Sequence, residues 1–455
     1  MSTLNSIMSI AGEALQSAQG ALNVTANNIA NSDTPGYTRE VVNLTESPTV
    51  HQGTLQMGTG VSLQGFTSVR NEVLQLQIDN QTQQANSSLA QSNALQQIET
   101  AFPSSGGIGA DMTAFFDSLS QLSTNPSSTS LRASVLSNAS NLVSDFHAAS
   151  ASISQLQTGL DETVPKSTTE INQLSTQIAN LNAQISSAGM AGQDSGPLVD
   201  QRDQLVSELS QITNVQTTST PNGVTLTTGN GTPLVVGNQS FSLTSATGSD
   251  GLQHVLQNGQ DITSSLTGGS LGGTLQVRDS ELPALQTKLD TLASQFSSAV
   301  NSANKAGFDL NGVAGQAVFS TAGTSGAAAS IQLALTSASQ IAASSDGTAG
   351  SGGNLANLLA VQTTALPSGM TPVGAYSDLV YTVGNAASQS QTTNAAANAA
   401  LGQLQSQQAS LSGVSVDQET TNMIQYQQAY QAAAKVVSTV DSLYQILITM
   451  GVTVA

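Results

Sequence analysis

Hydrophobic residues recur with a seven-residue period at both ends of the chain. The steps between these positions alternate between four and three residues near the N-terminus and between three and four near the C-terminus. Such spacing keeps one face of a helix apolar and lets two helices wrap around each other. The positions are Leu4, Met8, Ala11, Leu15, Ala18, Leu22, Thr25 and Ile29 in the first segment, and Met423, Tyr426, Tyr430, Ala433, Val437, Val440, Tyr444 and Leu447 in the last. We call these two sets the terminal seams and predict that they pair as a coiled coil, with ordinary amphipathic core helices as the alternative.

More helical periodicity lies between the seams. It occupies residues 174–185, 197–212, 282–300 and about 376–411. Residues 213–275 are instead dense in Thr, Val and Gly, and their "VTLTT" and "PLVVG" runs flank the turn signal "GNGT", which predicts strands joined by hairpins. Residues 307–374 are rich in Gly, Ala and Ser, and we expect a loosely specified mixed insert there that could be partly disordered.

These elements predict a mainly α fold with β inserts (α+β) and discontinuous, nested domains. We expect a terminal coiled-coil domain of residues 1–35 and 416–455, with both chain ends at one end of the molecule. A long-helix core domain is expected from residues 36–212, 276–306 and 375–415. One or two small outer β-rich domains complete the prediction, namely residues 213–275 and the mixed insert 307–374.

The composition narrows the possible partners. Only 8% of the 455 residues are charged, and the net charge is −19 with nine Lys and Arg. The acidic balance argues against binding to nucleic acid or to anionic membranes, which require a basic surface. A polar but weakly charged surface suits packing against copies of the same chain, because few charges must be desolvated. The chain has no cysteine and no tryptophan.

Residues that could perform chemistry are few and scattered. The three histidines, His51, His147 and His254, show no metal-ligand spacing, and the sequence has neither a nucleophile elbow nor a phosphate loop. The Gly-rich run 268–273 is interpreted as turns. Asp200, Asp203 and Glu208 lie near Arg202, and we interpret this cluster as a structural face paired with that arginine. We predict no catalytic residue, metal, cofactor or enzymatic activity.

The segment from Ala26 to Arg39 reads "ANNIANSDTPGYTR". It resembles the N-terminal signature of the flagellar rod, hook and hook-associated proteins, through Asn27, Asn28, Ile29, Ala30, Asn31, Thr34, Pro35, Gly36 and Tyr37. Residues 415–451 resemble the C-terminal helix of the same family. The interior segments 197–215 and 272–312 are similar to the branch of this family that forms the hook–filament junction.

The resemblance implies a structural subunit of the bacterial flagellum. It would assemble on the hook end through the terminal seams, which would form an inner tube, and adapt the hook to the filament. Implied partners are copies of itself, hook protein, hook-associated protein 3 and an export chaperone on the C-terminal helix, without nucleic acid or membrane insertion. The resemblance also implies export in an unfolded state through the flagellar type III channel, without a cleavable signal, to an extracellular position.

Three other interpretations remain open at this point. The chain could be another axial flagellar protein, such as a hook or distal rod subunit, although its long internal helices favour the junction branch. The β segment 213–275 could add a surface-adhesion role. An embedded metallopeptidase is the third, but the sequence lacks the HExxH pattern that such an enzyme would need.

Overall fold

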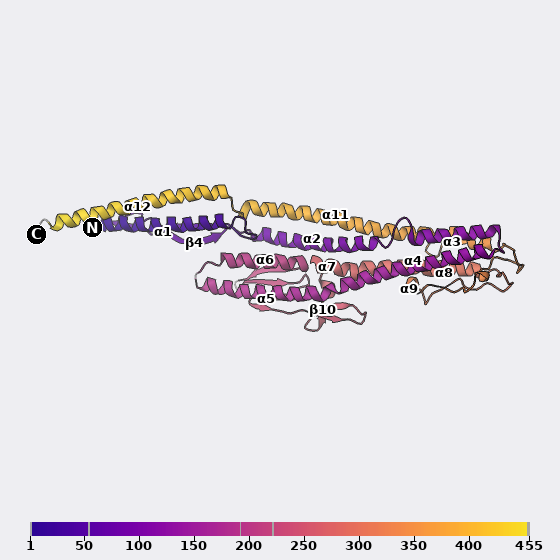
Figure 1. Cartoon of the computed structure of the whole chain (residues 1–455). Helices are drawn as coiled ribbons and strands as arrows, with labels where there is room; N and C mark the ends of the chain where they lie inside the picture. Colours follow the sequence, from indigo (N-terminus) through magenta and orange to yellow (C-terminus); the bar gives the residue numbers. More distant parts are fainter. Residues whose placement is uncertain (1, 53–54, 192, 221–222, 453–455) are drawn as a thin grey trace.

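The computed structural model describes residues 2–52, 55–191, 193–220 and 223–452 as one elongated molecule (Figure 1). The first and last helices lie side by side at one end, where both chain ends are found. The remainder is a stack of long helices with small antiparallel sheets attached to it. The molecule therefore consists of a terminal unit and a larger core arranged end to end.

The terminal unit is built on the two helices that carry the terminal seams, α1 (Ser2–Ala30) and α12 (Val416–Val452). They run antiparallel, and the Tyr444 hydroxyl is hydrogen-bonded to Asn5 near the shared end. An antiparallel ribbon also packs on α1, and a short hairpin extends from it. Its strands are β1 (Glu40–Glu46), β2 (Val50–Gln52), β3 (Leu55–Met57) and β4 (Val61–Ser68). Contact with α1 is close at Gly20, where an added Cβ would lie 2.8 Å from a Leu63 methyl carbon.

The core continues the line of the terminal pair with α2 (Glu72–Glu99) and α11 (Pro372–Ser412). These helices are antiparallel neighbours, since Gln75 bonds Gln408 and Gln81 bonds the Ala397 carbonyl. Local sequence sets where they begin. The Asn71 side chain accepts a bond from the Leu74 N–H at the start of α2, and a threonine before Pro372 does the same for α11.

A large apolar core fills the far half of the molecule. Its helices are α3 (Gly107–Thr124), α4 (Thr129–Asp161), α8 (Leu282–Lys305) and α10 (Leu355–Thr363), together with the distal part of α11. Phe115 lies at its centre, with ring centroids 5.4 to 6.1 Å from those of Phe116, Phe296 and Phe319. Each such pair adds about 0.5–1.5 kcal/mol beyond simple burial, so this cluster stabilises the distal end.

A second apolar core lies below α2 in Figure 1, in the half of the helical stack that is nearer the terminal unit. It combines α5 (Thr163–Met190) and α6 (Gly196–Ile212) with two antiparallel sheets, ordered β5-β6-β7-β8 and β11-β10-β9. The strands are β5 (Gln216–Thr220), β6 (Gly223–Thr227), β7 (Pro233–Val236), β8 (Gln239–Ser240), β9 (Thr244–Thr247), β10 (Gln253–Gln257) and β11 (Gln260–Asp261). The prediction from sequence places α5 and α6 in the helical core domain and the strands in a separate β-rich domain. In the structure these helices and strands share one apolar core.

Asparagine side chains attach the strands to α5. Asn182 is fully buried and donates to the carbonyls of Val224 and Gly237 while accepting from the Val224 N–H. Asn172 both donates to and accepts from the backbone of Leu243. An asparagine amide can donate and accept like a peptide group, so each side chain substitutes for a missing neighbouring strand.

The Gly-rich run 268–273, interpreted from the sequence as turns, is mostly helical. It belongs to α7 (Gly269–Gln276), which continues through a π-helical turn, η2 (Val277–Glu281), into α8. A Cβ on Gly273 would collide with the backbone oxygen of Ser87 on α2. Glycine is required here because two helix backbones touch, and this is the physical reason the turn interpretation is wrong.

Residues 307–374 also differ from expectation. Their elements are short, namely β12 (Phe319–Ser320), α9 (Ala327–Ser330), β13 (Gln332–Leu333) and η3 (Ala338–Gln340), followed by α10. Nevertheless Ala327, Ile331 and Ile341 are buried in the large apolar core. Asn304 and Asn354 hold the segment by bonding its backbone. It is thus packed as part of the core, although little of it is regular structure. Likewise, the range 36–212, expected to be helical, contains the four strands of the ribbon and hairpin.

One face of α2 is polar although it is buried. Asp79, Thr82 and Gln83 are neighbours on this face, and each is at least nine-tenths buried. Asp79 accepts a 2.9 Å hydrogen bond from Gln75, but burial raises the pKa of its carboxyl to about 7. A charged Asp79 therefore opposes folding at neutral pH.

Asn182→Ala should destabilise the second core by about 1–3 kcal/mol, because it leaves buried peptide groups of β6 without partners. Chemical denaturation followed by circular dichroism measures this loss. Asn180→Ala changes an exposed residue on the same helix and provides the control. Equal stability of the two variants would contradict the role assigned to Asn182.

Asp79→Asn should stabilise the protein at pH 8 by about 2–4 kcal/mol, since a neutral amide replaces a carboxylate whose pKa is raised. The folded state binds a proton more readily than the unfolded state, so the free energy of unfolding falls as pH rises from about 4 to 7. The variant should lose that slope in thermal unfolding between pH 4 and 8. Asp117→Asn, at an exposed site on α3, should retain it.

Candidate functional site

The terminal seams are only partly covered in the single chain. On α1, Ala11 and Ala18 are buried, and the large seam residues are half-buried. On α12, Ala433 and Val440 are buried, whereas Tyr430 and Leu447 are 39% and 48% exposed. The remaining α12 positions, Met423, Tyr426, Val437 and Tyr444, are half-buried. The helices thus approach closely at small residues and leave large ones at the margin.

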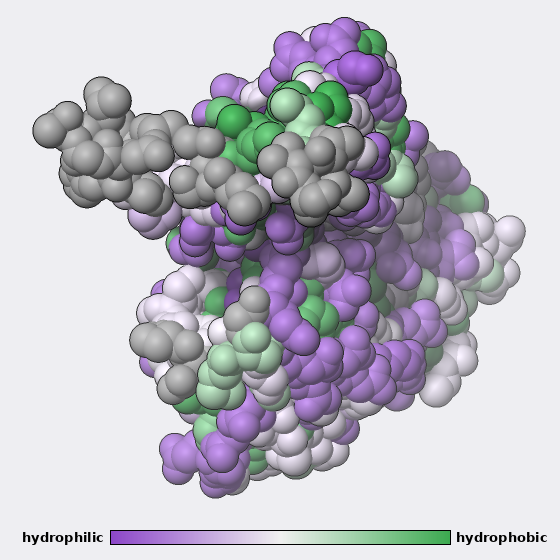
Figure 2. Space-filling model, turned by 90° about the vertical axis from the view of Figure 1, so that its left-hand side faces the viewer, coloured by the Kyte–Doolittle hydropathy of each residue, from purple (hydrophilic) through white to green (hydrophobic). Residues whose placement is uncertain are grey.

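A set of large apolar residues on α12, which shares Leu447 with the seam, faces solvent. We call it the exposed stripe: Val436, Leu443, Ile446, Leu447 and Met450, which are between 42% and 62% exposed. At about 100° per residue, the stripe is turned by roughly a quarter of a circle from Ala433 and Val440. Figure 2 views the molecule from the end that carries the chain termini and shows hydrophobic atoms gathered there. The apolar arc of α12 is therefore wider than α1 covers.

The motif residues at the end of α1 build a compact turn. Asn28 is buried: its amide donates 2.8 Å to the Glu40 carbonyl, and its oxygen accepts from the Glu40 N–H and the Tyr37 hydroxyl. Asn31 donates to the carbonyl of Asn27, one helical turn earlier. Gly36 has a φ of +78°, which allows the tight reversal after Pro35. The turn brings the chain from α1 back into β1.

The same turn reaches down to the core. Asp200 on α6 accepts from the Thr38 N–H at 3.0 Å and from the Thr38 hydroxyl at 2.7 Å. It also accepts from Arg70, which forms a 2.6 Å ion pair with it and donates to the Gly196 carbonyl. The sequence predicts that this cluster pairs with Arg202. In the structure that arginine bonds Asp203, and Asp200 pairs with Arg70, 130 residues away.

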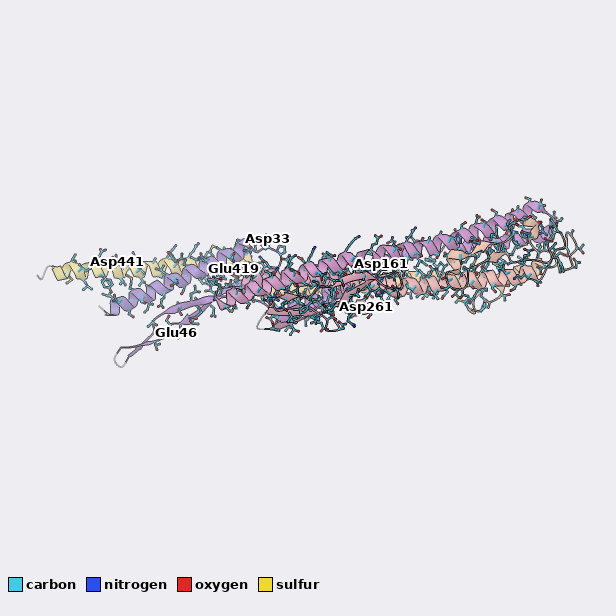
Figure 3. All side chains as sticks on the ribbon, turned by 90° about the horizontal axis from the view of Figure 1, so that it is seen from below. Asp33, Glu46, Asp161, Asp261, Glu419 and Asp441 are labelled. Atoms are coloured by element: carbon cyan, nitrogen blue, oxygen red, sulfur yellow. The ribbon has the colours of Figure 1, made fainter. Side chains whose placement is uncertain are left out.

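Arg39 connects the turn to α12. Its Nε lies 2.7 Å from Glu419, whose side chain is 2% exposed (Figure 3). Its N–H donates to the Ser412 carbonyl at the end of α11, and its carbonyl accepts from the Val69 N–H. We call this region the joint: residues 37–40, 68–71, 194–204 and 412–419.

Burial, together with the negative charge of several neighbouring acidic groups, raises the pKa values of Tyr37 and Glu40 in the joint. Burial, with the negative charges of Glu40, Asp200 and Glu419, raises the pKa of Tyr37 to about 12. The Tyr37 hydroxyl therefore stays protonated and donates to Asn28 at any physiological pH. Burial, followed by the charge of Asp194, raises the pKa of Glu40. A groove of about 490 Å³ adjoins these groups and is lined mainly by polar side chains.

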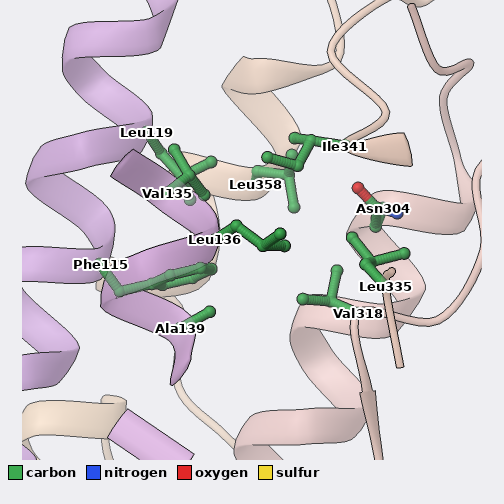
Figure 4. A pocket seen from close by; sticks show the side chains of 10 residues that line it. All are labelled: Phe115, Leu119, Val135, Leu136, Ala139, Asn304, Val318, Leu335, Ile341 and Leu358. Carbon is green, nitrogen blue, oxygen red and sulfur yellow. The ribbon is translucent and has the colours of Figure 1, made fainter. Parts of the chain in front are cut away.

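Elsewhere the described residues offer little for catalysis. A pocket in the large core, lined by residues such as Phe115, Leu136 and Leu358, has a volume of about 10 Å³ (Figure 4), which is room for at most one water molecule. His147 bonds a backbone carbonyl, and His254 lies between Asp250 and Asp261. The side chain of His51 lies outside the described residues. Among described residues, no His, Cys, Asp and Glu cluster is arranged to hold a metal ion.

The positions of acidic residues and the hydropathy of the helices bear on the expectations from composition. In Figure 3 the labelled Asp33, Glu46, Asp161, Asp261, Glu419 and Asp441 lie between the end that carries the termini and the middle of the molecule, and Glu419 is buried. Of the helices in the described part of the chain, none is both long and apolar enough to span a membrane. The sequence predicts the seams and the motif, but it does not pair Arg39 with Glu419 or Arg70 with Asp200, because these partners are distant along the chain.

Family models match three parts of the chain. The flagellar hook-associated protein FlgK helical domain matches residues 95–319. The C-terminal model of the flagellar basal body rod FlgEFG proteins matches residues 405–450, and the flagella basal body rod protein model matches residues 8–38. The interior match is thus to one hook-associated protein, and the terminal matches are to rod-type ends.

Curated relatives and a solved structure agree with these matches. Flagellar hook-associated protein 1 of Escherichia coli is 26% identical, over 98% of this chain and 100% of its own length. That of Bacillus subtilis is 27% identical over 97% of each chain. The flagellar hook junction protein FlgK from Burkholderia pseudomallei has the same fold, with a TM-score of 0.67 at 22% identity, over 74% of this chain and all of that one. The chain belongs to the flagellar hook-associated protein 1 family.

Proposed function

We propose that the terminal helix pair is the assembly surface of this protein, and that neighbouring subunits cover its exposed stripe. The chain is a structural protein of the bacterial flagellum that belongs at the hook junction. Its role is mechanical: it packs against other flagellar proteins. The observation that carries the proposal is the apolar arc on α12, which α1 covers only in part.

The energetics favour a further partner on that arc. Burial of apolar surface contributes about 25 cal/mol per Å², and the stripe has five large side chains that are each about half exposed. A monomeric protein gains nothing from a contiguous apolar surface of this kind. Few charges would have to be desolvated, because residues 435–450 include only two charged side chains, Lys435 and Asp441.

We infer that an unlike surface of the neighbouring subunit covers the stripe, which lies to one side of the α1–α12 contact. Contacts between unlike surfaces do not close into pairs and instead generate tubes or filaments. We infer that successive copies add side by side around a tube. Hook protein would lie beneath them and hook-associated protein 3 above them.

The same stripe requires protection before assembly. An exposed amphipathic helix is prone to non-specific association, which favours a cytoplasmic chaperone that holds α12 until export. Export through the flagellar type III channel in an unfolded state is compatible with a chain that has no cysteine and so cannot be trapped by disulfides. The surface-adhesion role of residues 213–275 stays a prediction, without a specific observation in its favour.

Leu443→Asp should block assembly while leaving the free chain folded. Leu443 is 44% exposed in the single chain, so a carboxylate there remains hydrated, but a neighbouring subunit would bury it. A penalty of several kcal/mol should reduce incorporation by at least about a hundredfold. Complementation of a bacterium that lacks its own copy, with electron microscopy of hooks and filaments, measures the effect.

Two matched variants separate assembly from folding. Gln445→Asp places the same charge at an exposed polar position, about 160° around α12 from Leu443, and should leave filaments attached. Val440→Asp introduces the charge at a residue that is 3% exposed, and it should lower the helix content of the free chain as well. Normal filaments on cells that carry Leu443→Asp would refute the assembly surface.

A further inference from the structure

The terminal unit and the core have separate packing. Within the described residues, the extensive contacts between elements fall inside one unit or the other: α1 with α12 and the ribbon, and α2 with α11, α7 and α6. Only two stretches of chain pass between the units. One is residues 69–71, from β4 to α2, and the other is residues 413–415, from α11 to α12. Two short tethers leave one rotation free, about the line that joins them.

A third attachment stops this rotation. The turn after α1 lies between the two tethers: the backbone of Arg39 donates to Ser412 beside one tether and accepts from Val69 in the other. Thr38 and Arg39 are adjacent residues that lead from the turn into β1, and their side chains bond to different units. Thr38 bonds Asp200 on the core, and Arg39 bonds Glu419 on the terminal unit.

The bonds at this point are directional and well shielded. Side-chain exposure is 14% for Asp200, 20% for Arg39, 22% for Arg70 and 2% for Glu419. Charge-assisted bonds of this kind are stronger and more geometrically demanding than neutral ones. Most of the side chains that line the adjoining groove are polar, among them Gln75, Gln405 and Gln408. Apolar packing therefore does not determine the angle between the two units.

We propose that Thr38 and Arg39 act as a two-way buckle, with Asp200 and Glu419 as its anchors, that sets the angle between the terminal helix pair and the core. Asp200 is the positioning residue, since it collects the donors of both the turn and the first tether. Without this anchor, the terminal pair swings about its two tethers while each unit keeps its own fold.

Spin-label distance measurements on the full chain test the buckle. Because the chain has no cysteine, labels can be attached to engineered cysteines alone. Gln428→Cys on α12 with Ser187→Cys on α5 spans the joint, and both positions are exposed. Ser187→Cys with Gln211→Cys lies within the core and reports its integrity. The intact joint should give one narrow distance distribution across the units.

Asp200→Ala should replace that narrow peak by a broad distribution, while the distances within the core stay unchanged. Asp378→Ala removes an exposed ion pair with Lys288, far from the joint, and should keep the narrow peak. Thr38→Val, which loses only the hydroxyl bond, should broaden the peak less, and Thr38→Ser should not. If Asp200→Ala disturbs the core distances, the Thr38 pair decides the question with the same labels. A narrow peak in Thr38→Val and Asp200→Ala alike, or a broad one in the intact chain, would overturn the proposal.

Discussion

The antiparallel contact between the first and last helices governs the arrangement of everything between them. Since α1 and α12 must lie side by side, the intervening chain leaves one end of the molecule and returns to it. The α2–α11 pair repeats the same antiparallel geometry one step further along. The segments that follow α1 along the chain lie between α1 and α12, and most of them also lie between α2 and α11. Helix pairing alone thus produces nested, discontinuous units.

The low charge of the chain matters at its interfaces. Many contacts between helices use Ser, Thr, Asn and Gln, which can be buried with local hydrogen bonds at little cost. Ser88 bonds within α2 and also accepts at its carbonyl from Ser390 on α11. Such surfaces allow long helices to pack without wide apolar faces. Large exposed apolar groups consequently stand out at α12, where we propose that a further partner covers them.

Periodicity and local turn chemistry predicted much of the fold. The terminal helices, the helices around residues 174–185 and 197–212, and the strands near 224–236 follow from patterns within a few residues. The joint could not be predicted in the same way, because Arg39 and Glu419 are 380 residues apart. The prediction of a loosely specified insert at 307–374 was wrong for another reason. The buried residues of this segment, such as Ile331 and Ile341, follow no regular spacing. Asn304, at the end of the preceding helix α8, and Asn354, within the segment itself, hold it through bonds to its backbone, and no periodic signal reveals these bonds.

The location of both chain ends at one tip has a practical consequence. A fluorescent protein or affinity tag fused to either terminus would sit beside the proposed assembly surface. The exposed turn at residues 348–350 lies near Ser127, at the connection between α3 and α4 in the opposite half of the molecule. Labels for imaging the living flagellum are better inserted at that turn.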